Sequence, residues 1–271
     1  MKPENYVIKE NQDGTVITVK DIQKVLLKIM VEFDRICNKH NLDYVLAFGS
    51  QLGAVRHHGF IPWDDDIDIW MTRKAYLKLV EILKQELKSP FYFQCFEKED
   101  KYNVTIPNMK IKIENTFLKE KNTIIKNRLD GEGLFIDIFI LDSISENKYK
   151  HLFHRIVSTS IMPFIIIFDI MNIDSRFFTK LLYRYSNWYA NKNKDSKYGY
   201  LSLSWTYDSF KDRRVLKSDV FPSIKWQFED YSFRIANNYD KILKETYGDY
   251  MQLPKQASRQ PKHIKEIIID L

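Results

Sequence analysis

The sequence predicts a mixed α/β fold (α+β) in which helices and strands alternate through about Asp142 and a mostly helical part follows. Three observations support this prediction. Several segments repeat apolar residues every three or four positions, as amphipathic helices do, and several short segments are typical of strands. The 271 residues are 44% hydrophobic, which is enough to bury a sizeable core. This composition excludes a disordered chain and a small protein held together by disulfides.

The first strong element is a helix. Apolar residues spaced by threes and fours predict it over Asp21–His40, with Asp21 as its N-cap. Residues Tyr44–Phe48 are rich in β-forming types and predict a buried strand that ends at the turn Gly49-Ser50. A short helix is expected from Ser50 to His57.

The following segments continue the alternation. Asp66–Trp70 alternates polar and apolar residues and predicts a strand, after which Thr72 can cap a helix that ends before Pro90. Further strands are expected at Phe91–Phe96, Met109–Ile113 and Leu134–Leu141. Together these elements predict a mixed sheet with flanking helices.

The α/β pattern gives way to helices near Asn147, so we divide the chain into a core of residues 1–146 and a helical, aromatic-rich part of residues 147–271. The stretch Ile156–Met171 is the most hydrophobic of the chain, but it is shorter than the ~18 residues that a membrane span needs. We expect a buried core helix there. The alternative is a helix that lies against a membrane surface.

The charge balance gives a weak indication of partners. Lys and Arg number 42 against 36 Asp and Glu, so the formal net charge is +6. The positive charge is spread along the chain, and no basic stripe is interleaved with aromatic residues. We therefore expect no nucleic-acid partner.

Two cysteines, Cys37 and Cys95, each lie in an apolar stretch and outside any metal-binding pattern. We expect buried free thiols in a reducing compartment. The N-terminal residues lack the apolar core of a signal peptide, so the expected location is the cytoplasm, with the inner face of the membrane as an alternative.

One segment concentrates acidic side chains. Asp64, Asp65, Asp66 and Asp68 lie within five residues, and such like charges repel unless a cation or strong donors are nearby. On a strand, Asp66 and Asp68 project from one face about 7 Å apart, a span that hard divalent ions can bridge. Asp64 and Asp65 are expected to orient or neutralise their neighbours.

A later strand supplies a third carboxylate. Asp137 stands among apolar residues, where an unpaired buried carboxylate is costly, so it needs a partner. If its strand adjoins that of Asp66 and Asp68, the three carboxylates form a cage for Mg²⁺ or Mn²⁺, as in displacement at phosphorus. Asp142 is expected to be a turn or cap residue, with metal ligation as the alternative.

The turn Gly49-Ser50 fits a phosphate group. It offers a small residue that lets the backbone approach, a hydroxyl, and free N–H groups at a helix start. Combined with the Asp-x-Asp strand and a later strand Asp, it describes a phosphate site of the nucleotidyltransferase type.

These motifs resemble those of a known family. The run Gly49–Ile69, with Leu-Gly-Ala-Val-Arg-His and Phe-Ile-Pro-Trp-Asp-Asp-Asp-Ile-Asp-Ile, resembles the signature of the LicD family of phosphocholine transferases, distant relatives of the fukutin-related proteins. Three later segments resemble further motifs of that family in the same order: Lys110–Thr116, Phe135–Phe139, and Tyr247–Pro254 with Arg259 and His263. Lys112 stands where the family more often has Arg, and Lys255 where a second Pro is usual.

The resemblance implies a nucleotidyltransferase-like catalytic core in residues 1–146, and a C-terminal part that completes the donor and acceptor site. It implies transfer of phosphocholine from CDP-choline to a sugar hydroxyl, with release of CMP. The acceptor would be a lipid-linked or polymeric cell-surface glycan, such as a teichoic acid, lipoteichoic acid or lipopolysaccharide precursor. Metals at Asp66, Asp68 and Asp137 would bind the pyrophosphate, and Asp137 could take the acceptor proton.

Two groups of residues are expected to bind the donor. The phosphate group is expected to contact Gly49, Ser50, Arg56, His57, Lys110 and Lys112, although ion pairing or solvation explains Arg56 and His57 equally well. Choline should be held by aromatic faces, and we expect Trp205, Tyr207 and Trp226 there with Glu229 as counter-charge. Packing in the core is the alternative for these aromatic residues.

Two other functions stay open. One is transfer of ribitol phosphate, glycerol phosphate or a nucleotide on the same scaffold. The other is a non-catalytic module that binds choline or a glycan, against which the clustered carboxylates argue because a binding module does not need them.

Overall fold

The computed structural model describes residues 6–11, 13–98, 108–120, 133–171, 173–201 and 213–270. Its helices are α1 (Val19–Lys39), α2 (Phe48–His57), α3 (Arg73–Glu86), α4 (Lys148–Ile170), α5 (Arg176–Lys192), α6 (Lys217–Val220), α7 (Tyr239–Tyr247) and the 3₁₀ turn η2 (Gln256–Ser258). Its strands are β1 (Val7–Glu10), β2 (Val16–Thr18), β3 (Val45–Leu46), β4 (Asp68–Thr72), β5 (Phe91–Gln94), β6 (Met109–Ile113), β7 (Thr116–Glu120), β8 (Phe135–Ser143), β9 (Tyr198–Tyr200), β10 (Val215–Leu216), β11 (Ile224–Phe228), β12 (Tyr231–Ile235) and β13 (Ile264–Ile269).

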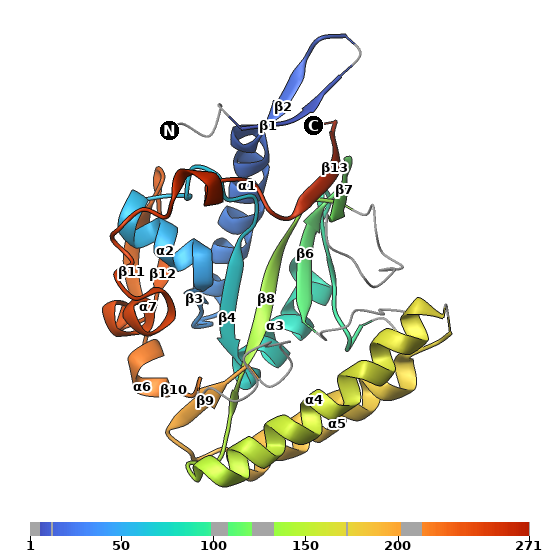
Figure 1. Cartoon of the computed structure of the whole chain (residues 1–271), viewed down its shortest axis with the longest axis vertical. Coiled ribbons are helices and arrows are strands. Elements are labelled where there is room, and N and C mark those ends of the chain that lie inside the picture. The colour runs from blue at the N-terminus through green and yellow to red at the C-terminus, as the bar shows by residue number, and fades with distance from the viewer. Residues whose placement is uncertain are drawn as a thin grey trace.

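The main sheet is built around the long strand β8 (Figure 1). On one side β4 runs parallel to β8 and β3 pairs antiparallel with β4, while on the other side β6 and then β5 follow in antiparallel pairing. The end of β8 pairs with β9, which pairs with β10. The predicted mixed α/β fold is confirmed, and the C-terminal part contributes strands to the sheet as well as helices.

The two faces of β8 have different surroundings. Ile136, Ile138 and Ile140 are buried in the main core, to which α1 and α3 contribute their apolar stripes. Asp137 and Phe139 alternate with them and are half-buried on the opposite face. The main core therefore occupies one face of the sheet, while the other face carries Asp137 and, at Phe139, a smaller hydrophobic cluster.

Helix α1 begins earlier than the sequence predicted. Thr18 is its N-cap, and the Asp21 carboxylate in the first turn accepts hydrogen bonds from the Thr18 backbone N–H and hydroxyl. Assigning the cap to Asp21 was wrong because in this reciprocal arrangement the acidic residue stands three positions inside the helix. The predicted strand Tyr44–Phe48 is also shorter than expected, because α2 begins at Phe48.

Segments far apart in the sequence meet around the sheet. Strand β13, near the end of the chain, pairs antiparallel with β7, and the two lie side by side in Figure 1. The hairpin β11–β12 lies near α2 and α7 on the other side of the molecule (Figure 1). The division near Asn147 thus does not divide the sheet, which receives strands from both parts of the chain.

Helices α4 and α5 form a long hairpin that lies below the sheet in the view of Figure 1. One stripe of α4 is buried, including Met162 and Ile165, whereas Ile156 and Phe164 are exposed. The prediction of a core helix over Ile156–Met171 is therefore wrong for its outer stripe, because only one face of the helix finds a partner.

One helical stretch among the described residues, Lys148–Phe168, is long and apolar enough to cross a membrane by length and composition. Only 33% of its most apolar window is buried in the structure.

Both cysteines are buried free thiols, as predicted, and burial raises the pKa of Cys37 and of Cys95, the latter to about 12.

Candidate active site

The centre of the site is a pair of carboxylates on neighbouring strands. Asp68 opens β4 and is paired in register with Asp137 of β8. Since paired residues of adjacent strands project their side chains to the same face, the two carboxylates lie side by side on the face opposite the main core. The condition set for a carboxylate cage, that these two strands adjoin, is met. The predicted strand Asp66–Trp70 is wrong at its start, because β4 begins at Asp68 and Asp66 precedes it.

Two donors from the β6 side bind Asp137. Lys110 is its register partner on β6, and the Lys110 ammonium lies 3.0 Å from Asp137 Oδ1. The side-chain amide of Asn108 donates a hydrogen bond to the same oxygen at 2.8 Å. Asp137 therefore has the partner that its burial requires, and Lys110 places a positive charge at the edge of the site.

The remaining carboxylates of the acidic segment interact without enough positive charge. Burial raises the pKa of Asp68 well above its usual range, and the charges of Asp66, Asp137 and Asp64 raise it further. Burial likewise raises the pKa of Asp64, whose carboxyl group donates a hydrogen bond to Asp66. The site thus has a strong affinity for positive charge, in the form of protons or of a cation.

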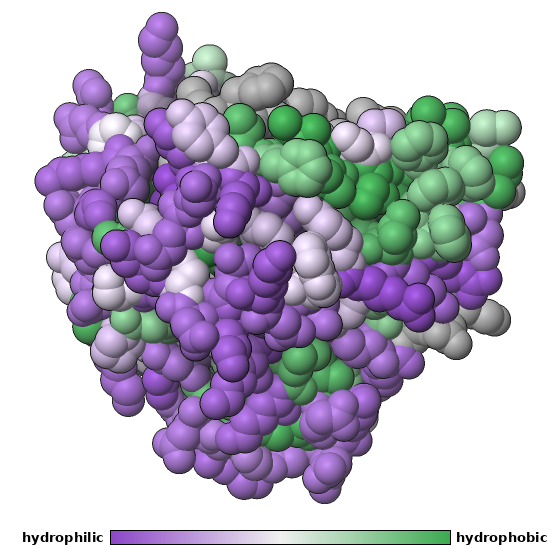
Figure 2. Space-filling view, turned by 90° about the horizontal axis from the view of Figure 1, so that it is seen from below, coloured by the Kyte–Doolittle hydropathy of each residue, from purple (hydrophilic) through white to green (hydrophobic). Residues whose placement is uncertain are grey.

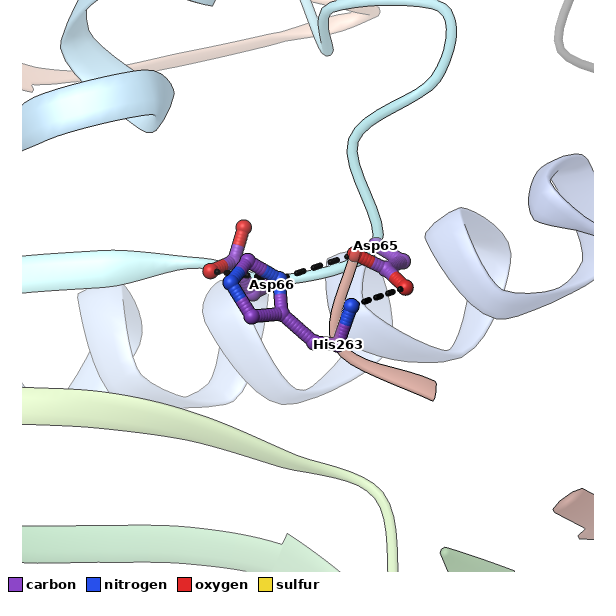
Figure 3. A group of neighbouring side chains, drawn as sticks. All are labelled: Asp65, Asp66 and His263. Atoms are coloured by element: carbon purple, nitrogen blue, oxygen red, sulfur yellow. Dashed lines mark hydrogen bonds and ion pairs between the residues drawn. The ribbon is translucent and has the colours of Figure 1, made fainter. Parts of the chain in front are cut away.

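His263 neutralises the opposite edge of the acidic segment (Figure 3). Its Nδ1 lies 2.9 Å from Asp65 Oδ1 and 3.3 Å from Asp66 Oδ2. The backbone N–H groups of His263 and Ile264 both donate to Asp65 Oδ2. These contacts, foremost the hydrogen bond with Asp65, raise the pKa of His263 to about 10, so the imidazole is positively charged at neutral pH.

Helix α2 brings its first turn against this cluster. The Asp68 N–H donates to the Ser50 hydroxyl oxygen at 2.9 Å, which fixes the start of β4 to the start of α2. A Cβ on Gly49 would lie 2.7 Å from Asp64 Oδ2, so only glycine allows this close approach. Phe48 has a φ of 43°, a strained conformation for a bulky residue at the entry to the turn.

The donor chemistry fits a hard divalent cation. Asp66, Asp68 and Asp137 offer only carboxylate oxygens, the ligands that Mg²⁺ and Mn²⁺ prefer. In the structure Asp66 contacts His263, and Asp137 contacts Lys110 and Asn108. Asp68 is the member of the three whose pKa burial and neighbouring carboxylates raise well above its usual range. Asp65, Asp66 and His263 have ligand atoms within 4.8 Å of one another. That second group fits a metal poorly, because the imidazolium would have to lose a proton before it could coordinate.

Arg56 and His57 lie at the end of α2. The Arg56 guanidinium donates to the carbonyl oxygens of Tyr250 and Gln252, at 2.8 and 3.4 Å, and to His57 Nε2. Burial, followed by the Arg56 charge, lowers the pKa of His57 to about 4, so this imidazole is neutral. Arg56 thus holds the segment after α7 against α2, and phosphate binding by the two residues stays a prediction.

Asp142 lies away from the cluster. It is fully buried in a two-pronged salt bridge with Arg73, with N–O distances of 2.6 and 2.8 Å. Its odd number of residues from Asp137 directs it to the other face of β8, so the alternative of metal ligation is wrong. Lys112 is buried on the Asp137 face with its ammonium 6.0 Å from the Phe135 ring centroid.

The predicted choline residues are only partly described. Trp205 and Tyr207 lie outside the described residues. The Trp226 indole N–H donates to the Ala54 carbonyl oxygen, and Glu229 accepts a hydrogen bond from the Phe60 N–H. These contacts attach the β11–β12 hairpin to α2 and the loop after it, and a choline-binding role for either residue stays a prediction.

Sequence reasoning missed two residues that shape the site and named a third, Tyr247, only as the start of the C-terminal motif. Asn108 directly precedes β6, Gln23 of α1 donates to the carbonyl oxygens of Ile61 and Asp64, and the Tyr247 hydroxyl lies near the carboxylates. Burial, followed by the charge of Asp64, raises the pKa of Tyr247. A buried polar residue inside an apolar helix stripe is a signal that could have identified Gln23.

The predicted C-terminal residues have different positions. His263 contacts the acidic cluster directly, as described above. Arg259 donates to the Pro254 carbonyl oxygen, and its guanidinium lies 5.8 Å from the centroid of the Trp63 ring. Arg259 therefore packs over the loop that leads into the acidic segment.

Comparison with known proteins gives one long and two short matches. Residues 41–153 match the family described as LicD/FKTN/FKRP, nucleotidyltransferase domain. The chain is 26% identical over 276 residues to the lipopolysaccharide cholinephosphotransferase LicD of Haemophilus influenzae, covering 93% of this chain and 98% of that protein. Over 60 residues it is 40% and 38% identical to uncharacterized proteins of Rickettsia prowazekii and Rickettsia typhi, covering 22% of this chain and 23% and 19% of theirs.

Proposed function

The chain carries a LicD/FKTN/FKRP nucleotidyltransferase domain, and from this premise we propose that it transfers phosphocholine from CDP-choline to a sugar hydroxyl of a cell-surface glycan, releasing CMP. Phosphocholine transfer in general is supported by the full-length similarity to a cholinephosphotransferase. The donor, the divalent metal and the glycan acceptor are the finer parts of the proposal. The location we propose is the cytoplasm, which fits the two buried free thiols.

The observation that carries the proposal is the register pairing of Asp68 with Asp137 beside Lys110. A group of carboxylates that is short of positive charge, next to one lysine and a helix start, suits a metal-bound pyrophosphate. Asp66, Asp68 and Asp137 would hold Mg²⁺ or Mn²⁺, which supplies the positive charge that stabilises the pyrophosphate as it is cleaved. Structural ion pairs alone would not explain why Asp64 and Asp68 are buried beside other carboxylates, which raises the pKa of both.

The residues of the chain divide the reaction between them. The N–H groups of the first turn of α2, at Gly49 and Ser50, bind phosphate oxygens, and the Lys110 ammonium balances charge on the leaving side. The acceptor hydroxyl oxygen bonds to the choline-bearing phosphorus, and the phosphorus–oxygen bond to CMP breaks with its electron pair on CMP. The hydroxyl proton passes to a carboxylate oxygen of Asp137.

A donor panel tests this function. The protein is incubated with Mg²⁺, a soluble sugar acceptor and, separately, CDP-choline, CDP-ribitol, CDP-glycerol or a nucleoside triphosphate. CMP release and a phosphocholine-bearing sugar, seen by mass spectrometry only with CDP-choline, are expected. Faster turnover of another donor would assign the site to that phospho-alcohol or nucleotide.

The same panel separates an enzyme from a binding module. Calorimetric binding of choline or glycan without CMP release from any donor would exclude catalysis. Within an active protein, unchanged KM for CDP-choline in Trp205→Ala and Trp226→Ala would exclude these aromatic residues from choline recognition.

A further inference from the structure

Helix α4 presents a stripe of large apolar side chains to solvent. Five of these residues are 49–66% exposed on its outer face, in two groups spaced by three positions with a gap of eight between Ile156 and Phe164: Phe153, Ile156, Phe164, Ile167 and Ile170. Solvent-exposed apolar residues are ordinary when single, but several of them on one face of a helix indicate a partner.

Helix α5 widens this stripe into a surface. Phe177, Leu181 and Trp188 are exposed on its outer side, with Phe177 the most exposed at 70%. Figure 2, seen from the side on which α4 and α5 lie in Figure 1, shows hydrophobic side chains gathered over one region and bordered by hydrophilic ones. We call these exposed side chains of α4 and α5 the hairpin patch.

The positive charge of the chain is concentrated on the same hairpin. Residues 148–192 contain seven Lys and Arg against two Asp and Glu, a net charge of +5, whereas the whole chain has +6. Lys150, Lys180, Arg184 and Lys192 are exposed next to the hairpin patch, and the Lys192 ammonium lies 5.2 Å from the centroid of the Trp188 ring. Apolar and aromatic side chains bordered by basic ones match the interface of an anionic bilayer.

The packing of the hairpin argues for a helix in the plane of the interface. The inner stripe of α4, with His154, Ser158 and Met162, is buried against the protein. A spanning helix would have to separate this stripe from α5 and expose its polar groups to lipid. The outer stripe alone is free to enter the headgroup region.

A second copy of the chain is a poorer occupant. In a two-fold dimer the same surface of each copy meets the other, so the exposed lysines and Arg184 of both copies would face one another. That arrangement costs electrostatic energy, which an anionic surface would instead supply.

We propose that the hairpin patch docks on an anionic lipid bilayer, with α4 and α5 lying in the plane of the headgroups. Asp137 lies near the start of β8, and α4 follows its end, about 20 Å along the strand from Asp137. The reaction centre and the docking surface are thus separated, and docking does not depend on the proposed chemistry.

Vesicle flotation tests the proposal with the full chain and without donor or acceptor. Vesicles of phosphatidylglycerol mixed with phosphatidylcholine are expected to bind the protein at low salt, and vesicles of pure phosphatidylcholine to bind it several-fold less. High salt should release most of the protein, because basic residues contribute to the attraction.

Exposed residues allow variants that leave the fold intact. The double variant Phe153→Ser/Phe177→Ser is expected to lower the partition coefficient about a hundredfold, and Arg184→Gln about fivefold. The matched controls are Val16→Ser/Leu77→Ser and Lys225→Gln, which change exposed residues elsewhere and should bind as wild type. All variants should melt as wild type and release CMP with a soluble acceptor at the same rate.

Five results would overturn the proposal, four of them in the vesicle experiments. These four are absence of binding to anionic vesicles, equal binding to both vesicle types, binding that the double variant retains, and resistance of the bound protein to alkaline carbonate, which indicates a spanning helix. A dimer in light scattering that Phe153→Ser/Phe177→Ser dissolves would likewise replace the bilayer by a second copy. If the wild-type protein floats with anionic vesicles but releases no CMP, the proposed function is refuted and the docking proposal stands.

Discussion

Asp68 and Asp137 are directly paired across the parallel strands β4 and β8, so two carboxylates separated by 68 residues of chain share one face of the sheet. This relationship concentrates negative charge in a buried part of the sheet. The predictions below follow from it and from the contacts that support it.

Replacing Asp68 should lower the activity and raise the stability of the metal-free protein. Asp68→Asn removes a proposed metal ligand and should lower CMP release about a thousandfold. It also removes a buried like charge, so the metal-free protein should gain ~1 kcal/mol of unfolding free energy, about 2–4 °C in Tm. Calorimetry and the CMP assay check this, with the exposed Asp230→Asn as control; near-normal turnover would contradict the assigned role.

Divalent metal should stabilise the folded protein. Mn²⁺ or Mg²⁺ at a hundred times its Kd should add ~2.7 kcal/mol to the unfolding free energy, and EDTA should remove that gain. The shift in Tm should be lost in Asp68→Asn and in Asp137→Asn, because each removes a ligand. A metal-dependent shift that survives both substitutions would place the metal elsewhere.

Replacing Ser50 should lower both the stability of the protein and its rate of CMP release. Ser50→Ala leaves the Asp68 N–H without its acceptor, and we expect a loss of ~1–3 kcal/mol in urea unfolding together with slower CMP release. Ser89→Ala, which removes an exposed hydroxyl bonded to Glu114, should cost under ~0.5 kcal/mol and serves as the control. Equal unfolding midpoints for the two variants would refute the prediction.

Removing one partner of the buried pair Arg73–Asp142 should lower the free energy of unfolding much more than replacing both partners. Arg73→Ala removes the guanidinium that forms a salt bridge with the fully buried Asp142 carboxylate and should destabilise the protein by about 3–5 kcal/mol. The double variant Arg73→Met/Asp142→Leu removes both charges and should recover most of that loss. Urea unfolding measures both, and a double variant as unstable as the single one would mean that packing, not charge, sets the cost.

His154 should make the protein sensitive to acid. Its ring is buried between α4 and α5, stacked on Tyr189 at 3.8 Å between centroids, and burial lowers its pKa to about 3. The unfolded chain takes up the proton near pH 6.5 while the folded protein does not, so stability falls below pH 6.5, by about 1.4 kcal/mol per pH unit down to pH 3. In His154→Phe the urea midpoint of unfolding should change less between pH 6.5 and pH 5 than in wild type, and the two proteins should have similar midpoints at pH 8. Parallel plots of midpoint against pH for the two proteins would contradict this.

The sequence predicted the two strands that carry Asp68 and Asp137, and the structure shows that they are neighbours. Period-two alternation around Asp68 and the apolar strand around Asp137 each identify a strand, but their adjacency was only the condition for a metal cage, and the partner that Asp137 needed is Lys110 with Asn108. The Thr18 cap was missed because Asp21, three residues later, is also a good cap residue.

Long-range contacts could not be predicted in this way. His263 meets Asp65 across 198 residues because β13 pairs with β7, and no local pattern specifies that pairing. The outer stripe of α4 was mistaken for core because periodicity identifies a helix but not what covers each face. Net charge was read as dispersed, although most of it lies on the α4–α5 hairpin.

The contact between Asp65 and His263 also determines when the protein can become active during its synthesis. Asp65 is almost fully buried, and its hydrogen-bond donors are the His263 side chain and the N–H groups of His263 and Ile264. Until the ribosome has released these residues, the acidic loop lacks the contacts that fix its shape, although every carboxylate has already been made. A truncated chain that ends before His263 would therefore contain all the proposed metal ligands but no working site.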